Sequence, residues 1–211
     1  MQLDKLSKTQ DVLDKRIMKE KGLEIGNDYI KETLLVNKIL ALQVELGELA
    51  NEWRGFKFWS EDQEPRDLIH HWFDTEGEEH KTIKRPTKYD NCILLKTKNP
   101  LLEEYVDCLH FFLSIGNDIG CDGEHSIKQV NNSMDWILEN RNVKETPIVE
   151  QFNVVFHDIS NFASMRSSDD YYIALSEFFI LGEKLGFTDQ QVEQAYFEKN
   201  QINHDRQVNG Y

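Results

Sequence analysis

The 211-residue sequence has few cysteines, no long apolar run and a shortage of positive charge. Its three cysteines, Cys92, Cys108 and Cys121, lie far apart and form no C-x-x-C pair, which argues against a disulfide framework and a zinc site. No apolar run is long enough to cross a bilayer. The first residues alternate apolar and charged side chains, so we expect no signal peptide. These absences predict a cytoplasmic protein with reduced thiols and no membrane partner.

Lysine and arginine number 24 against 38 aspartates and glutamates, which gives a formal net charge of −14. This balance repels the backbone of nucleic acids and argues against general DNA or RNA binding. An anionic ligand would need a cation as intermediary. No internal repeat, flexible linker or low-complexity tract divides the chain. We therefore predict a single domain over residues 1–211.

Helical periodicity dominates the sequence. The predicted helices span about residues 2–20, 32–53, 101–119, 148–165, 170–186 and 188–206. The last opens with Thr188 and Gln191 at capping-box spacing. Two segments interrupt this rhythm: 54–99, with a β-like run at 92–95, and 120–147, with a weak helical pattern. The prediction is an all-α helical bundle with insertions at these two places.

Two of the predicted helices carry acidic side chains among apolar ones. In "ALQVELGELANEW", Glu45, Glu48 and Glu52 advance by three and four and therefore share one face. In "LLEEYVDCLHFFLSIGND", a narrow polar stripe includes Glu104 and Asp107. Apolar residues surround that stripe, so we expect the helix to be buried on several sides, where a carboxylate needs a partner or a metal. Carboxylate oxygens suit Mg²⁺ or Mn²⁺, and the pattern predicts a shared metal site; a solvated acidic face is the alternative.

Three stretches, "ELGELANEWRGFKFWS", "NPLLEEYVDCLHFFLSIGNDIG" and "YFEKNQINHDRQVNGY", together resemble the dimeric all-α dUTPases of the helical nucleoside-triphosphate pyrophosphatase superfamily. The chain is most similar to members encoded by phages of Gram-positive bacteria. E-x-x-E followed by E-x-x-D recurs across the superfamily, whereas "HFFLS" and the tail are more specific to dUTPases. The resemblance implies a homodimer that uses Mg²⁺ to hydrolyse dUTP to dUMP and pyrophosphate, which keeps uracil out of DNA.

The resemblance also implies roles for individual residues. The metal ligands would be Glu45, Glu48, Glu104 and Asp107, with Mn²⁺ a possible substitute for Mg²⁺. Glu45 or Glu48 would also activate the attacking water as general base. The implied substrate contacts are Gln10, Lys57, Trp59, His110, Phe111, Lys199, Asn203, Arg206 and Tyr211. The lysines, the arginine and the terminal tyrosine would contact the phosphates, and the remaining residues the deoxyuridine.

Other interpretations stay open at the level of sequence. The metal stripes do not specify a base, so the same chemistry on another nucleotide such as dCTP is the nearest alternative. A di-iron bundle normally needs two E-x-x-H pairs, and an acidic interaction protein or DNA mimic predicts scattered, exposed carboxylates. Analogy with phage relatives adds a hypothetical second role in binding a repressor of a mobile genetic element. If phage-encoded, the enzyme would act in the cytoplasm of a bacterial host.

Overall fold

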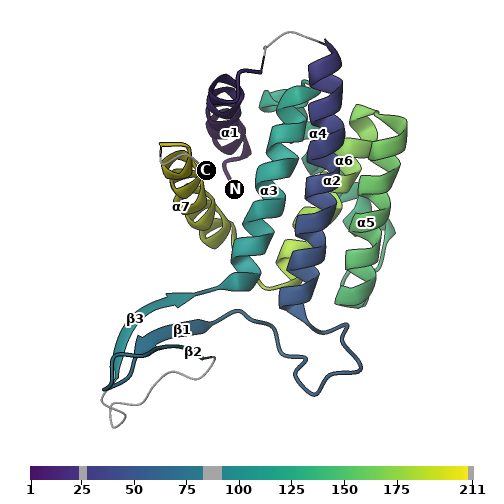
Figure 1. Ribbon diagram of the computed structural model, residues 1–211. Helices are drawn as coiled ribbons and strands as arrows, with labels where there is room; N and C mark the ends of the chain where they lie inside the picture. Colours follow the sequence, from purple (N-terminus) through teal and green to yellow (C-terminus); the bar gives the residue numbers. More distant parts are fainter. Residues whose placement is uncertain (24–27, 83–91, 209–211) are drawn as a thin grey trace.

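The computed structural model describes residues 1–23, 28–82 and 92–208 of the chain. Its helices are α1 (Leu3–Glu20), α2 (Asp28–Trp53), α3 (Pro100–Asp118), α4 (Gly123–Asn140), α5 (Ile148–Met165), α6 (Ser168–Lys184) and α7 (Asp189–Val208). Its strands are β1 (Ile69–Phe73), β2 (Glu79–Thr82) and β3 (Ile93–Lys98). None of the described helices combines the length and the apolar character that a membrane span requires. The helices form a bundle with one small sheet beside it (Figure 1), so the predicted all-α class is confirmed.

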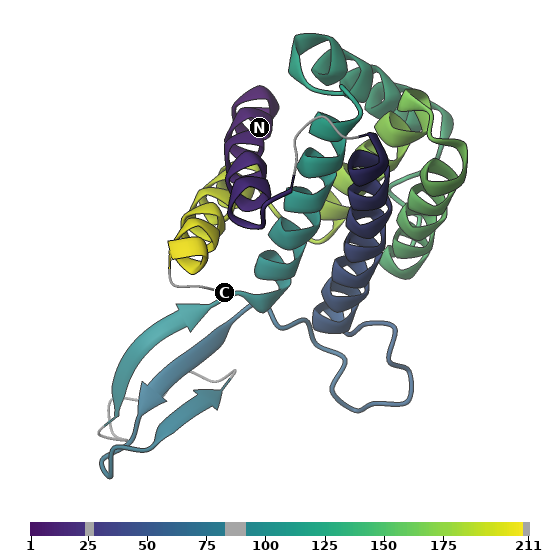
Figure 2. The same cartoon turned by 45° about the horizontal axis from the view of Figure 1, so that its top comes forward.

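The centre of the bundle is the pair α2 and α3, which lie side by side (Figures 1 and 2). The apolar side of α2 is buried, and its buried residues are Leu35, Ile39, Leu42, Leu46 and Leu49. Helix α3 also contacts α1, α6 and α7, which confirms that it is buried on several sides. Full burial of one such leucine or isoleucine contributes roughly 1.5–3 kcal/mol. The packing of α2 on α3 is therefore a main source of stability for the bundle.

Local sequence signals define where two of the helices begin. Pro100 is the first residue of α3, and the side chain of Asn99 accepts a hydrogen bond from the backbone nitrogen of Leu102 at 3.0 Å. At the start of α7, the backbone nitrogen of Gln191 donates to Thr188 Oγ1 at 3.3 Å. The backbone nitrogen of Thr188 donates in return to Gln191 Oε1 at 2.9 Å. This reciprocal pair confirms the predicted capping box.

Two elements differ from their sequence-based prediction. Residues 120–147 contain a full helix, α4, which packs on α6, although the sequence predicts only a weak helical pattern there. The buried residues of α4 are Ser126, Val130 and Ile137, a stripe too sparse to indicate a helix clearly. Helix α2 begins one turn earlier than predicted. Its first turn is exposed, as at Tyr29, and therefore adds no apolar periodicity.

Strands β1, β2 and β3 form a projection that we call the β-arm. The sheet is antiparallel in the order β2-β1-β3, where the sequence indicates only one β-like run at 92–95. It extends beyond the ends of α2 and α3 (Figures 1 and 2). Arg66 attaches its base to the bundle: the guanidinium pairs with Glu52 at 3.2 Å, and the backbone nitrogen donates to the Glu52 carbonyl oxygen at 2.9 Å. The carbonyl oxygen of Arg66 accepts from the backbone nitrogen of Leu101 at 3.2 Å.

A buried acidic side chain joins α4, α5 and α6 on the side of the bundle away from α7. Glu177 of α6 is only 2% exposed and forms an ion pair with Arg141, the residue after α4. The amide nitrogen of Gln151 on α5 donates to the Glu177 carboxylate at 2.7 Å and to the Glu177 carbonyl oxygen at 3.0 Å. The two partners together compensate the buried negative charge.

Removing the cation of this cluster should destabilise the protein. We expect Arg141→Met to lower the free energy of unfolding by about 3 kcal/mol, because it leaves the Glu177 carboxylate buried without its counter-ion. Urea denaturation measures the difference. Lys144→Met, at an exposed position three residues further along, is the matched control and should change stability by less than about 0.5 kcal/mol. Equal effects of the two substitutions would contradict this account of the cluster.

Candidate active site

Acidic side chains of α2 and α3 meet on the facing sides of the two helices. One oxygen from each of Glu45, Glu104 and Asp107 lies within 4.8 Å of the other two. Glu45 comes from α2, and the other two lie one turn apart on α3. Glu48, one turn further along α2, is exposed. The structure thus brings three of the four predicted metal ligands together and places the fourth at their margin.

Burial and mutual repulsion disturb the protonation of this carboxylate cluster. Burial raises the pKa of Glu104 to about 7, and the negative charges of Asp107, Glu45 and Glu48 add to the effect. Burial also raises the pKa of Glu45, again with help from Asp107 and Glu48. The pKa of Asp107 is raised by burial, against the opposing effect of Lys199. A cluster of this kind favours the entry of positive charge.

The donor set of the carboxylate cluster fits a divalent cation. Three carboxylates supply hard oxygen ligands, and a cation between them would relieve the repulsion that raises their pKa values. One positive group already approaches, because Lys199 of α7 donates a hydrogen bond to Asp107 Oδ2 at 2.5 Å. The site therefore combines acidic ligands from α2 and α3 with a cation from α7.

A cavity of about 360 Å³ opens beside the carboxylate cluster, between α1, α2, α3 and α7. The residues predicted as site residues that line it are Gln10, Glu45, Asp107, His110, Phe111, Lys199, Asn203 and Arg206. They come from helices far apart in the sequence. Carboxylates, cations, amides and one aromatic ring therefore share a single cavity.

Two predicted substrate contacts, Lys57 and Trp59, do not line this cavity. Lys57 and Trp59 follow the end of α2; the Lys57 ammonium contacts the side chain of Asn51, and the Trp59 ring is 65% exposed. Trp59 packs edge-on against Phe58, with ring centroids 5.0 Å apart. Tyr211 lies outside the described residues. Lys57 and Trp59 belong to the segment that connects α2 to β1.

A sequence model of a protein family described as dUTPase matches residues 2–71 and 85–211. The chain belongs to the dUTPase family. It is therefore a dUTP diphosphatase, whose substrate is dUTP, and dUTPases generally use divalent metal ions. No protein among the curated sequences matches the chain. The match omits only residues 72–84 within its span, which hold the end of β1, a turn and β2.

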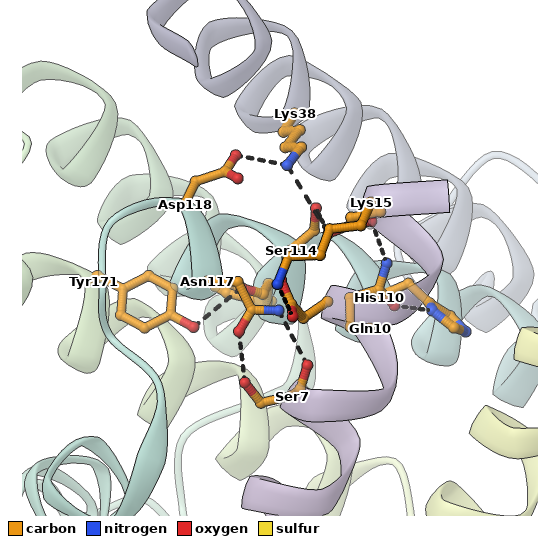
Figure 3. A network of polar contacts seen from close by, with 12 residues as sticks. Ser7, Gln10, Lys15, Lys38, His110, Ser114, Asn117, Asp118 and Tyr171 are labelled. Carbon is orange, nitrogen blue, oxygen red and sulfur yellow. Dashed lines mark hydrogen bonds and ion pairs between the residues drawn. The ribbon is translucent and has the colours of Figure 1, made fainter. Parts of the chain in front are cut away.

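The end of the dUTPase cavity away from the carboxylate cluster contains polar residues that sequence reasoning did not assign to the site. Asp14 of α1 accepts hydrogen bonds from Gln10 Nε2 at 2.7 Å and from Ser114 Oγ at 2.6 Å. Lys38 of α2 pairs with Asp118 at 2.6 Å and lies 4.0 Å from Asp14 (Figure 3). The only available signal for Asp14 was its position one turn after Gln10. Its partners on other helices depend on the fold.

The metal-free dUTPase should become more stable when Glu104 loses its charge. Its pKa is about 7 in the folded protein against an ordinary 4.5, so the folded state holds the proton more tightly. The contribution of Glu104 to the free energy of unfolding of the wild type is therefore fully present below pH 4.5 and is lost as the pH rises through 7. Because Glu104→Gln is neutral throughout, we expect a gain of about 1 kcal/mol near pH 8, after allowance for solvent screening of a half-exposed group.

Urea denaturation in EDTA at about pH 8 and pH 4 measures this gain, which should disappear at the lower pH. Glu139→Gln, at an exposed position on α4, is the control for loss of one negative charge. A gain of equal size in the control, or no gain near pH 8, would show that repulsion within the carboxylate cluster does not strain the fold.

Proposed function

We propose that this dUTPase hydrolyses dUTP to dUMP and pyrophosphate with the help of Mg²⁺, and so keeps uracil out of DNA. The observation that carries the proposal is the meeting of carboxylates from α2 and α3 at a cavity that cations of α7 also line. The residues proposed to hold the metal are Glu45, Glu48, Glu104 and Asp107. These carboxylates would hold the ion, whose charge would stabilise the triphosphate and lower the pKa of the attacking water.

Glu45 is the proposed general base. It lines the cavity, whereas Glu48 is exposed and does not. Burial and the neighbouring carboxylates raise the pKa of Glu45, which increases its affinity for a proton. A carboxylate oxygen of Glu45 would therefore take the proton of the water that attacks the substrate.

The cations of α7 are proposed to bind the phosphates. Lys199 and Arg206 both line the cavity, on the same helix and two turns apart. Their positive charges offset the acidic character of the surrounding site and can donate hydrogen bonds to phosphate oxygens. Lys199 already lies against Asp107, so it stands at the boundary between the carboxylates and the proposed phosphate position.

The deoxyuridine is proposed to occupy the part of the cavity lined by Gln10, His110, Phe111 and Asn203. The Phe111 ring is partly buried there and can pack against the face of uracil. Burial lowers the pKa of His110 to about 3, so its imidazole is neutral at physiological pH. Gln10, His110 and Asn203 thus offer polar atoms without net charge, which suit a neutral nucleoside.

Pyrophosphate release from dUTP, dCTP, dTTP and UTP, with Mg²⁺ and then with EDTA, tests the proposed function. We expect release from dUTP alone and only with the metal. Asp107→Asn should lower kcat by about a hundredfold or more, because it removes one charge from the electrostatic site. Asp135→Asn, at an exposed position on α4, should leave the rate unchanged. Full turnover in EDTA would exclude the metal mechanism, and equal release from dCTP would exclude uracil selectivity.

We also propose that the enzyme is a homodimer joined through the outward face of α2. Val36, Leu40 and Val44 are 47%, 61% and 51% exposed and follow one another at helical spacing. They form an apolar stripe on the side of α2 opposite the core. A twofold axis would place this stripe against itself, which is the usual arrangement in homodimers. The stripe runs toward the carboxylate cluster, since Glu45 follows Val44 directly.

Leu40→Glu should convert the dimer into a monomer, because the interface would then bring two carboxylates together in an apolar setting. Sedimentation equilibrium or light scattering measures the molar mass. Val12→Glu on α1 is a matched control, since Val12 is also 61% exposed but lies outside the stripe. If Leu40→Glu retains the mass of the wild type, or if the wild type is itself a monomer, α2 is not the interface.

A further inference from the structure

A chain of hydrogen bonds connects α1 and α3 at the nucleoside end of the cavity. His110 Nδ1 lies 2.6 Å from Gln10 Oε1 (Figure 3). Gln10 Nε2 donates to Asp14 Oδ1 at 2.7 Å, and Ser114 Oγ donates to Asp14 Oδ2 at 2.6 Å. All four residues line the cavity. The Gln10 amide therefore lies between the carboxylate of Asp14 and the imidazole of His110.

The carboxylate determines the direction of the whole chain. Burial raises the pKa of Asp14, but the charge of Lys38 and the hydrogen bonds of Ser114 and Gln10 oppose this and favour the ionised form. An ionised carboxylate can only accept, so Asp14 then requires the NH₂ group of Gln10 to face it. The Gln10 oxygen must then face His110, and because an amide oxygen also only accepts, the proton of the imidazole must be on Nδ1. The hydroxyl of Tyr196 is compatible with this orientation: it lies 2.9 Å from Gln10 Oε1 and 3.2 Å from the carbonyl oxygen of Leu6.

This direction leaves His110 Nε2 as an unprotonated acceptor. Burial lowers the pKa of His110 to about 3, so the neutral ring holds a single proton. Nε2 is buried and has no hydrogen-bond partner among the residues that the structure describes. A buried acceptor without a donor is unfavourable, and His110 borders the cavity. The missing donor is therefore expected from a ligand in the cavity.

We propose that Asp14 is a positioning residue that, through Gln10, holds His110 as a hydrogen-bond acceptor for the N3–H group of uracil. The inference rests on the proposed binding of deoxyuridine at this end of the cavity. N3 carries a hydrogen in uracil and a lone pair in cytosine, so a fixed acceptor favours uracil and repels cytosine. A sugar hydroxyl both donates and accepts, so it would pair with either tautomer of His110. The tautomer of His110 therefore affects recognition of the base and not of the sugar.

Asp14→Asn tests the positioning role because it preserves size and adds a donor. Lys38 Nζ and Ser114 Oγ both approach Oδ2 of Asp14, at 4.0 and 2.6 Å. In Asp14→Asn, the amide oxygen should occupy the position of Oδ2, because Lys38 and Ser114 can donate to it there. The NH₂ group of the new side chain then faces Gln10. The Gln10 amide should then rotate, donate to His110 Nδ1 and move the ring proton to Nε2.

Nitrogen-15 NMR of the His110 ring in the full-length enzyme, without metal or nucleotide, reads the tautomer directly. We expect the proton on Nδ1 in the wild type and on Nε2 in Asp14→Asn. Asp118→Asn is the matched control, since it removes the other carboxylate that pairs with Lys38 and should leave the tautomer unchanged. A wild-type proton on Nε2 would overturn the inference even if Asp14→Asn failed to fold, and an unchanged tautomer in a folded Asp14→Asn would overturn it too.

Steady-state kinetics test the link to the base. We expect Asp14→Asn to reduce the ratio of kcat/KM for dUTP over dCTP by about tenfold or more, because uracil loses an acceptor and cytosine gains a donor. The ratio for dUTP over 2′,3′-dideoxyuridine triphosphate should stay constant, as should both ratios in Asp118→Asn. An inverted tautomer with an unchanged dUTP-to-dCTP ratio would overturn the role in base selection. Absence of dUTP turnover in the wild type would instead reject the proposed function. The NMR measurement would still test whether Asp14 sets the tautomer of His110.

Discussion

Repulsion between like charges is the constraint around which this enzyme is arranged. Carboxylates of α2 and α3 lie within a few ångströms of one another, partly shielded from water, and the pKa of Glu104 rises to about 7 as a result. Apolar packing between the two helices keeps them in place against that repulsion. The concentrated negative charge attracts cations, which are also what a triphosphate requires. An acidic protein can in this way bind an acidic substrate.

The rest of the cavity follows from the geometry of α3. Successive turns of this one helix present Asp107, then His110, then Ser114 to the same cavity. Of these three α3 side chains only Asp107 carries a formal charge, and it pairs with Lys199. The next two turns carry neutral hydrogen-bonding groups, whose orientation depends on partners in α1. A single rigid helix thus sets the spacing between the charged end of the cavity and its nucleoside end.

Much of the helical framework could be predicted because a helix face depends only on spacing along the chain. The stacking of Glu45 and Glu48 and the buried character of α3 follow from that periodicity. The β-arm could not be predicted in the same way, since its pairing of His70 with Thr97 joins residues distant in sequence. The contacts of Asp14 belong to the same category, because Ser114 and Lys38 reach it from other helices.

The attachment of the β-arm has a consequence for how the molecule opens. The sheet projects from the bundle, and Arg66 ties its base to the ends of α2 and α3 (Figures 1 and 2). Three short strands bury far less apolar surface than the paired helices, so they form a separate cooperative unit of lower stability. We therefore expect the amide hydrogens of β1 to β3 to exchange with solvent through local unfolding, and those of α2 and α3 to exchange only on global unfolding. Local unfolding of β2, which the family match omits, would therefore leave the carboxylates of α2 and α3 in place.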